Sequence, residues 1–313
     1  MNANFKIFLL TLVVWIFTLP HAFAGRVFVE GKFTFPFSKQ KTAAEPKIDL
    51  PKSSANIIIA NFNLREFDKT KVRKTDVMVI LAKTISQFDI VAIQEIRDAS
   101  GIAIRSLEHA IDAMGTNYEI ITGPRLGITS SKEQYAYMYN TKTIFAGESY
   151  TFDDPADYFH RDPFIASFKT KNGDFDFVLI TLQTDPDDAS REINAIPIVV
   201  KDAQKHFPDE QDFIVLGDLR ADCQYFNEDD QSGFMRDPEF IWLITNDMDT
   251  SLGDSSCTYD RIIVTTATAN EDYTGKSGVF RFDRAFGLTK SMANKVSDHY
   301  PVYSLFYVNK DTD

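Results

Sequence analysis

Short apolar runs that stop at a polar residue restrict the fold of this chain more than any other feature. Residues 56–62 (NIIIANF) form a nearly continuous apolar run rich in β-branched side chains, which is typical of a strand buried on both faces. Further strands are predicted over residues 89–94, 135–139, 175–182, 212–216, 261–265 and 300–306. We expect the first strand at the centre of a sheet.

Helical patterns lie between several of these runs. Apolar side chains recur at helical spacing from Val77 to Phe88 and again from Ile104 to Met114. A third helix is predicted over Ala189–His206, where Pro197 should kink the helix or delay its start. This mixture of strands and helices predicts an α+β fold of two packed sheets with helices outside.

The N-terminal 55 residues differ from the remainder. Residues 1–24 carry one charge, Lys6, before an apolar run of 13 residues and the small-residue pattern AFA at 22–24, which together predict a cleaved secretory signal peptide. The run is shorter than the ~20 residues of a membrane-spanning helix, so no anchor is expected after cleavage. Residues 25–55, with six basic and three acidic side chains, are expected to form a basic linker, and residues 56–313 a single domain. The protein is therefore expected to be secreted or periplasmic, and monomeric.

Charge and cysteine content limit the partners and the compartment. The net charge of −12 argues against a protein held on nucleic acid by bulk charge, so a polyanionic substrate must meet a local or metal-neutralised site. In an oxidising compartment, Cys223 and Cys257 favour one disulfide over two free thiols.

Polar residues at the strand ends are the candidate site. Mg²⁺ prefers one or two carboxylates with the remaining oxygens from water and phosphate, and Glu95 with Asn63 could supply protein ligands. His299, flanked by Asp298 at the start of the last strand, is the best placed histidine for proton transfer. An acid that follows a strand is usually an ordinary capping or turn residue, so the prediction of a site rests on the whole set of polar residues.

Six motifs, in order and in spacing, connect these residues to a known family. They are NFNLREF at 61–67, IQEIR at 93–97, KEQY at 132–135, GD at 217–218, CTYDRI at 257–262 and SDHYP at 297–301. Together they resemble pancreatic-type deoxyribonuclease I, of the endonuclease/exonuclease/phosphatase superfamily, from about residue 56 to residue 306. The resemblance implies a four-layer α/β/β/α sandwich that hydrolyses phosphodiesters with a divalent metal, and a Cys223–Cys257 disulfide.

The resemblance also implies roles for individual residues. Glu95 would be the chief ligand of Mg²⁺ or Mn²⁺, with Asn63 and Asp298 nearby. His299 would act on the water or the leaving group, with Asp260 orienting it. Asp218 would hold the region of the scissile phosphate or, as in some relatives, handle a proton. The candidates for phosphate contacts are Arg65, Arg97 and Arg161, although surface salt bridges would equally explain them. Ca²⁺ is a further candidate cation, because residues 249–253 fall near a calcium site of the pancreatic enzyme, but that loop matches poorly.

Two departures from the family pattern bear on catalysis. Gln183 occupies a position where the pancreatic enzyme has a catalytic histidine oriented by a glutamate, here Glu133; glutamine cannot transfer a proton near pH 7. Arg220 replaces the asparagine of the Gly-Asp-x-Asn signature. We hypothesise that the changes are coupled, with Arg220 filling the vacated space, pairing with Glu133 and offering charge to the phosphate. The alternative is that both record a loss of catalysis.

These observations lead to one principal function and two alternatives. The principal one is a secreted, metal-dependent phosphodiester hydrolase, a deoxyribonuclease I-like endonuclease with DNA as substrate. The first alternative is a hydrolase of another phosphoester, either toxin-like or acting on a lipid or sugar phosphate. The second is a binding protein that has kept the fold and lost the chemistry.

Overall fold

The computed structural model describes residues 50–127, 132–229 and 233–313. The expected signal peptide and residues 25–49 of the expected linker lie outside these ranges. Among the helices of the described ranges, none combines the length and the apolar character that crossing a membrane requires.

The first of two mixed sheets contains the N-terminal strand. Its order is β11-β12-β1-β2-β4-β3, and β1 pairs in parallel with β2 and antiparallel with β12. Its strands are β1 (Asn56–Phe67), β2 (Ile90–Ile96), β3 (Tyr118–Leu126), β4 (Glu133–Asn140), β11 (Tyr273–Val279) and β12 (Val302–Tyr307). The central place of β1 is the one that its apolar run predicts.

The second sheet has the order β5-β6-β7-β8-β10-β9, with β7 and β8 parallel. Its strands are β5 (Ile144–Thr151), β6 (Phe164–Thr170), β7 (Asp176–Gln183), β8 (Phe213–Asp218), β9 (Phe240–Trp242) and β10 (Asp260–Thr265). Because β10 runs antiparallel to β8, the first residue of β10 lies opposite the last residue of β8.

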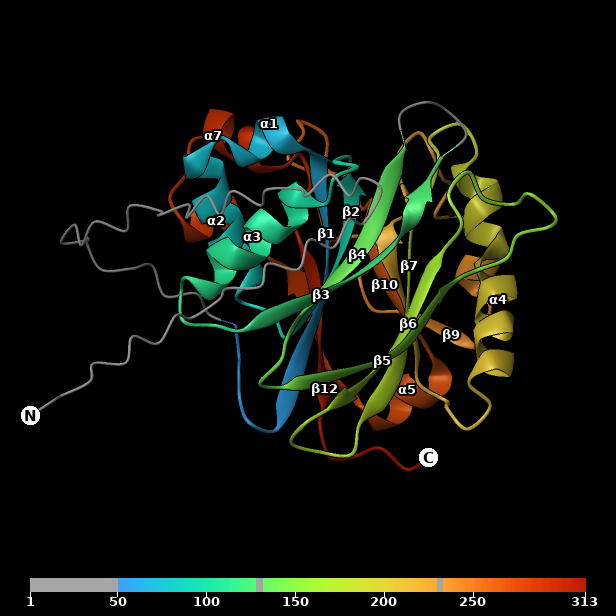
Figure 1. Cartoon of the computed structure of the whole chain (residues 1–313). Coiled ribbons are helices and arrows are strands. Elements are labelled where there is room, and N and C mark those ends of the chain that lie inside the picture. The colour runs from blue at the N-terminus through green and yellow to red at the C-terminus, as the bar shows by residue number, and fades with distance from the viewer. Residues whose placement is uncertain (1–49, 128–131, 230–232) are drawn as a thin grey trace, which may run out of the picture. The chain divides into compact units, whose positions relative to one another are not determined.

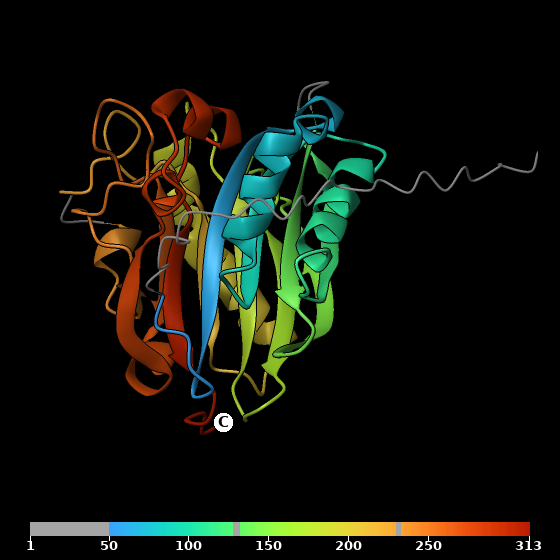
Figure 2. The same ribbon diagram turned by 90° about the vertical axis from the view of Figure 1, so that its left-hand side faces the viewer.

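Helices cover the outer faces of both sheets. Figure 1 shows α1, α2, α3 and α7 on the side of the first sheet and α4 on the side of the second, and Figure 2 shows α2 and α3 lying over the strands of the first sheet. The helices are α1 (Lys69–Val72), α2 (Thr75–Ile85), α3 (Ile102–Asp112), α4 (Ala189–His206), α5 (Thr266–Glu271), α6 (Phe282–Ala285) and α7 (Lys290–Val296), with a 3-10 turn η1 at Phe234–Arg236.

Two apolar clusters show how the layers pack. The first joins side chains of both sheets, among them Ile59, Tyr137, Leu179 and Ile262, and so lies between the sheets. The second packs the apolar face of α4, for example Ile196, on β7, β8 and β10. The predicted four-layer α/β/β/α sandwich is therefore confirmed.

The structure differs from the sequence-based expectation in two respects. The helix predicted over residues 189–206 begins at Ala189 with Pro197 inside it, so the proline does not delay its start. Strands β3, β5, β6, β9 and β11 were not predicted. β3, β5 and β11 are edge strands with mixed exposure and β9 has three residues, so these four lack a clear apolar pattern, whereas the prediction missed β6 although most of its residues are buried.

Candidate active site

The expected site residues come together at one end of both sheets. Asp218 is the last residue of β8. It pairs with Gln183 at the end of β7 and with Asp260 at the start of β10. From the first sheet come Asn63, where regular pairing of β1 with β2 is interrupted, and Glu95 near the end of β2. This end carries α1 and α7 in Figures 1 and 2, whereas the C-terminus lies at the other end.

Two amide side chains bridge the carboxylates of Glu95 and Asp218. Asn63 Nδ2 donates to Glu95 Oε1 and to Asp218 Oδ2, both at 3.0 Å. Gln183 Nε2 donates to the same two oxygens at 3.0 and 3.2 Å. Burial would raise the pKa of Glu95, but the Asn63 amide, the backbone N–H of Glu66 and the Gln183 amide outweigh it and lower that pKa. Gln183 therefore holds two carboxylates in their charged form, which a glutamine can do without exchanging a proton.

A backbone irregularity in β1 shapes the side of this cluster that carries Asn63 and Glu95. The register of β1 against β2 shifts between Asn63 and Phe67, and Arg65, Glu66 and Glu95 have φ values of 47°, 49° and 61°. Non-glycine residues rarely adopt this left-handed region, and such backbone outliers concentrate at functional sites.

Lys71 supports this irregularity, a role that no sequence pattern indicates. Its side chain is buried, and Nζ donates to the carbonyl oxygens of Leu64 at 2.6 Å and Arg65 at 2.8 Å. Burial lowers the pKa of Lys71 to about 8. A lysine on a short helix ordinarily points to solvent, which is why pattern analysis overlooks it.

His299 and Asp260 form a buried pair. His299 Nδ1 lies 2.8 Å from Asp260 Oδ2, and Asp260 Oδ1 accepts from Asn61 Nδ2 at 3.2 Å. The other ring nitrogen, Nε2, lies 3.8 Å from Asp218 Oδ2. Burial would lower the pKa of His299, but the charges of Asp260 and Asp218 outweigh it and raise that pKa to about 10. The ring is therefore an imidazolium near neutral pH, with Nε2–H facing the cluster.

Arg220 does not pair with Glu133, so that part of the coupled hypothesis is wrong. Arg220 Nη1 donates to the carbonyl oxygen of Thr184 at 2.5 Å, and Nη2 lies 3.9 Å from Asp218 Oδ2. Desolvation of Asp218 would raise its pKa, but the charges of His299 and Arg220 lower it. Arg220 thus lies in the site and acts on Asp218.

Glu133 is instead held by two other arginines. Its Oε1 accepts from Arg97 Nε at 2.9 Å, and its Oε2 lies 3.3 Å from Arg161 Nε. Arg97 Nη1 also pairs with Glu66 Oε1 at 2.6 Å. With no histidine at position 183 to orient, Glu133 positions two of the three predicted phosphate-binding arginines beside the site.

Asp298 and Arg65 lie at the rim. Arg65 Nε is 3.5 Å from Asp298 Oδ2, and the Asp298 side chain is 45% exposed. Arg65 Nη1 also donates to Asn294 Oδ1 at 2.8 Å. In the loop at 249–253, Asp249 accepts from the backbone N–H of Ser251 and lies 3.5 Å from Arg281 Nη1, so its charge is already compensated.

The residues at the centre of the site fit a divalent cation. Asp218 Oδ1 and Gln183 Oε1 are buried acceptor oxygens without a hydrogen-bond partner. Buried acceptors are ordinarily satisfied, and hard cations bind such oxygens together with carboxylates.

The predicted disulfide lies directly behind the site. Cys223 and Cys257 are bonded, with Cα atoms 5.9 Å apart. The bond joins the loop after Arg220 to the segment that leads into Asp260. It therefore fixes the distance between two segments that carry site residues.

The fold defines the class of protein: the chain has the endonuclease/exonuclease/phosphatase fold. An endonuclease/exonuclease/phosphatase family protein from Bacteroides thetaiotaomicron has a TM-score of 0.54 and 16% identity, covering 80% of this chain and 97% of that chain. TDP2 from D. rerio, complexed with a single-strand DNA product, has a TM-score of 0.56 and 15% identity, covering 80% and 98%. No protein-family model matches the chain.

Sequence comparison defines the family. Deoxyribonuclease gamma from Homo sapiens is 34% identical over 256 residues, covering 78% of this chain and 84% of the relative. Deoxyribonuclease-1 from Homo sapiens is 32% identical over 264 residues, covering 81% and 93%. The chain belongs to the deoxyribonuclease I family, as its six motifs predict.

Proposed function

We propose that this protein is a secreted, divalent-metal-dependent phosphodiester hydrolase that acts as a monomeric DNA endonuclease. The observation that carries the proposal is the buried His299–Asp260 pair, whose free ring nitrogen faces Asp218 beside the amide-bridged Glu95. A site that had lost its chemistry would have no reason to retain a buried imidazolium among three carboxylates, because such an arrangement is costly unless it is used.

His299 is the proton donor in this proposal. Its raised pKa keeps Nε2 protonated at neutral pH. As the attacking water forms a bond to phosphorus and the bond to the leaving oxygen breaks, Nε2 gives its proton to that oxygen. Asp260 holds the ring by Nδ1 and stabilises its charge.

Asp218 is the group placed to accept a proton from the water. Its Oδ1 is unpartnered, and Gln183 cannot take the proton because an amide is not a base near pH 7. Arg220 lies beside Asp218 and near the phosphate region, where a permanent cation stabilises developing negative charge without transferring a proton. Gln183 and Arg220 together thus replace a histidine and an asparagine by a fixed amide and a fixed charge.

Glu95, with Asn63 and with Asp298 from the rim, would hold the divalent cation. Mg²⁺ or Mn²⁺ bound there would supply positive charge to a phosphate oxygen. The lowered pKa of Glu95 keeps its carboxylate available for this role.

Four arginines supply positive charge at the site of this acidic chain, beside the carboxylates with which they pair. Arg97 and Arg161 are positioned by Glu133, Arg65 lies at the rim, and Arg220 lies at the centre. Guanidinium groups match phosphate oxygens in a two-pronged geometry, so we expect DNA to be bound through its backbone with strong salt dependence. The two deoxyribonuclease relatives support DNA as the substrate.

Secretion is supported by the N-terminal sequence and by the disulfide. A structural disulfide is typical of proteins in oxidising compartments. Determining the N-terminus of the exported protein tests this point: a mature chain that begins near Gly25 supports it, and a retained Met1 contradicts it.

Plasmid nicking by the purified mature protein tests the catalytic proposal. With Mg²⁺ or Mn²⁺ we expect nicking that chelator abolishes and that Glu95→Gln and His299→Ala each reduce by at least ~10²-fold. Nicking that survives chelator would contradict the metal requirement.

A Gln183→His, Arg220→Asn double variant distinguishes the alternatives. If only the double variant nicks DNA, the fold assignment holds and the natural chain is a binding protein or acts on another phosphoester. If the wild type nicks, the chemistry works with Gln183 and Arg220 in place.

A further inference from the structure

A second cluster of carboxylates lies at the end of the molecule opposite the candidate active site. Asp212 immediately precedes β8, whose last residue is Asp218. Glu210, Asp212 and Asp313 each place a carboxylate oxygen within 4.8 Å of the others. Three negative charges this close repel one another strongly unless something compensates them.

Two members of this region are buried with an unsatisfied oxygen. Asp212 is 2% exposed; its carboxylate has a side-chain hydrogen bond with Thr268, but its Oδ1 has no hydrogen-bond partner. Asp272, which is 1% exposed, has an unpartnered Oδ1 as well, and its charge acts on Asp212. An orphaned carboxylate oxygen at nearly complete burial is the exception in folded proteins, and a bound cation is an ordinary explanation for it.

Backbone N–H groups fix the orientation of the other carboxylates. The N–H of Asp212 donates to Glu210 Oε1, and the N–H of Gln211 donates to Asp313 Oδ2, both at 2.7 Å. The C-terminal segment is attached further by Asp311 Oδ2, which accepts from the N–H of Asp176 at 3.0 Å. The carboxylates are thus held toward one another instead of turning away into solvent.

We propose that Glu210, Asp212 and Asp313 form a Ca²⁺ site that ties the C-terminal segment to the start of β8. Ca²⁺–oxygen distances are ~2.3–2.6 Å, so two ligand atoms on the same ion lie up to ~5 Å apart, which accommodates the observed separation. Ca²⁺ accepts several carboxylates in an irregular shell, whereas Mg²⁺ keeps most of its water and takes one or two.

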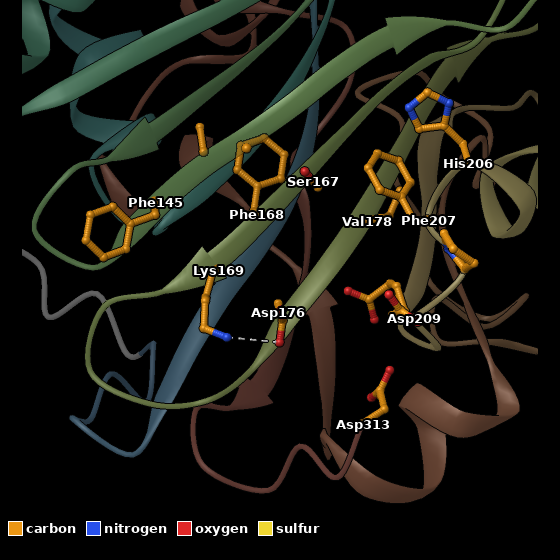
Figure 3. Close-up of a pocket in the computed structure, with 14 residues that line it drawn as sticks. Phe145, Ser167, Phe168, Lys169, Asp176, Val178, His206, Phe207, Asp209 and Asp313 are labelled. Carbon is orange, nitrogen blue, oxygen red and sulfur yellow. Dashed lines mark ion pairs between the residues drawn. The ribbon is translucent and has the colours of Figure 1, made fainter.

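The site is accessible from solvent. Glu210 and Asp313 line a cavity of about 410 Å³ together with Asp176 and Asp209. Figure 3 shows Asp176, Asp209 and Asp313 near one side of this cavity, with the ion pair from Lys169 to Asp176 drawn as a dashed line. An ion and its water ligands can therefore reach the exposed side of the cluster.

Protonation is the competing way to relieve the repulsion. Burial, together with the neighbouring carboxylates, raises the pKa of Asp212 to about 8. Calcium binding to Asp212 must displace this proton, so calcium affinity should rise with pH through about 8, which can be measured.

The test is calcium titration of the full mature chain at pH 7.5, by calorimetry and by thermal unfolding. A Glu95→Gln background removes the chief expected ligand of the other metal site, and no readout depends on nuclease activity. At a Ca²⁺ concentration ~100-fold above Kd we expect a rise in Tm of roughly 5–10 °C and one ion bound per chain. Asp212→Asn should abolish both, whereas Asp209→Asn, which removes a neighbouring charge outside the cluster, should preserve both.

Several results would overturn the proposal. The first is the absence of saturable Ca²⁺ binding in the Glu95→Gln background. The others are a loss of Ca²⁺ binding in Asp209→Asn as large as in Asp212→Asn, full Ca²⁺ binding in Asp212→Asn, or a rise in Tm with Mg²⁺ equal to that with Ca²⁺. If Asp212→Asn does not fold, the exposed Asp313→Asn provides the same comparison and should weaken calcium binding at least ~10-fold. Failure of the nicking experiment would leave this result unaffected, since the two sites are tested separately.

Discussion

The raised pKa of His299 can be tested directly by replacing its partner with Asp260→Asn. The pKa rises from 6.5 to about 10, which corresponds to roughly 5 kcal/mol of preferential stabilisation of the imidazolium at ~1.4 kcal/mol per pKa unit. Asp260 is the largest of the charges that raise it and lies 2.8 Å from Nδ1. We therefore expect more than half of the shift to disappear, so that the pKa of His299 falls by about 2 units.

The pKa of His299 is best followed by histidine-ring NMR of the chelator-treated protein from pH 5 to 10. Asp254→Asn is the matched control, because it makes the same chemical change at an exposed position paired with Lys290. Nicking activity of Asp260→Asn should fall by ~10²–10⁴-fold, since the ring loses its orientation and its charge. A wild-type His299 that titrates near 6.5, or one that Asp260→Asn leaves unmoved, would refute the reasoning.

Three further predictions concern stability. Replacing Cys223 and Cys257 by serine should lower the free energy of unfolding in urea by ~3–4 kcal/mol, the chain-entropy value for a closed loop of this length; an unchanged value would show that the reduced chain is already constrained there. Lys71→Met should lower the free energy of unfolding by ~2–4 kcal/mol, because it removes the two hydrogen bonds that the buried ammonium donates. The control Lys74→Met, at an exposed position, should lower it by less than ~0.5 kcal/mol. Equal losses of stability in the two variants would contradict the role of Lys71. Because the folded-state pKa of His299 is raised, its contribution to stability is fully present below pH ~6.5 and is lost as the pH rises through about 10. Denaturant unfolding should show this loss in the wild type but not in His299→Gln. If the free energy of unfolding depends on pH in the same way in both proteins, the prediction is wrong.

The sequence predicts the location of the site because the site lies at strand ends. Glu95, Asp218 and Asp260 each come at or near the boundary of a strand with a clear apolar pattern, and paired strands bring such boundaries to one edge. Most interior strands were predictable for the same reason, although β6 was not predicted. The edge strands β3 and β11 were not, since half-exposed side chains and glycines carry little periodic signal.

The sequence predicts which residues lie in the site better than it predicts which side chains pair with one another. The pairing of Arg220 with Glu133 fails because Arg97 and Arg161, from other parts of the chain, reach Glu133. Nor does the sequence show that Gln183 and Asn63 donate to the same two carboxylates. These contacts depend on rotamers and on sub-ångström placement, which a linear pattern does not encode.

The left-handed backbone at Arg220 has a consequence for how this chain can diverge. Its φ of 47° lies in the left-handed region, which asparagine and glycine adopt readily. For a residue with a long side chain, this backbone conformation costs ~1–2 kcal/mol of folding free energy. A library of all residues at position 220, selected for stability alone, should therefore return asparagine or glycine, and one selected for turnover should return arginine. Arginine at this position therefore adopts a backbone conformation that its side chain does not favour.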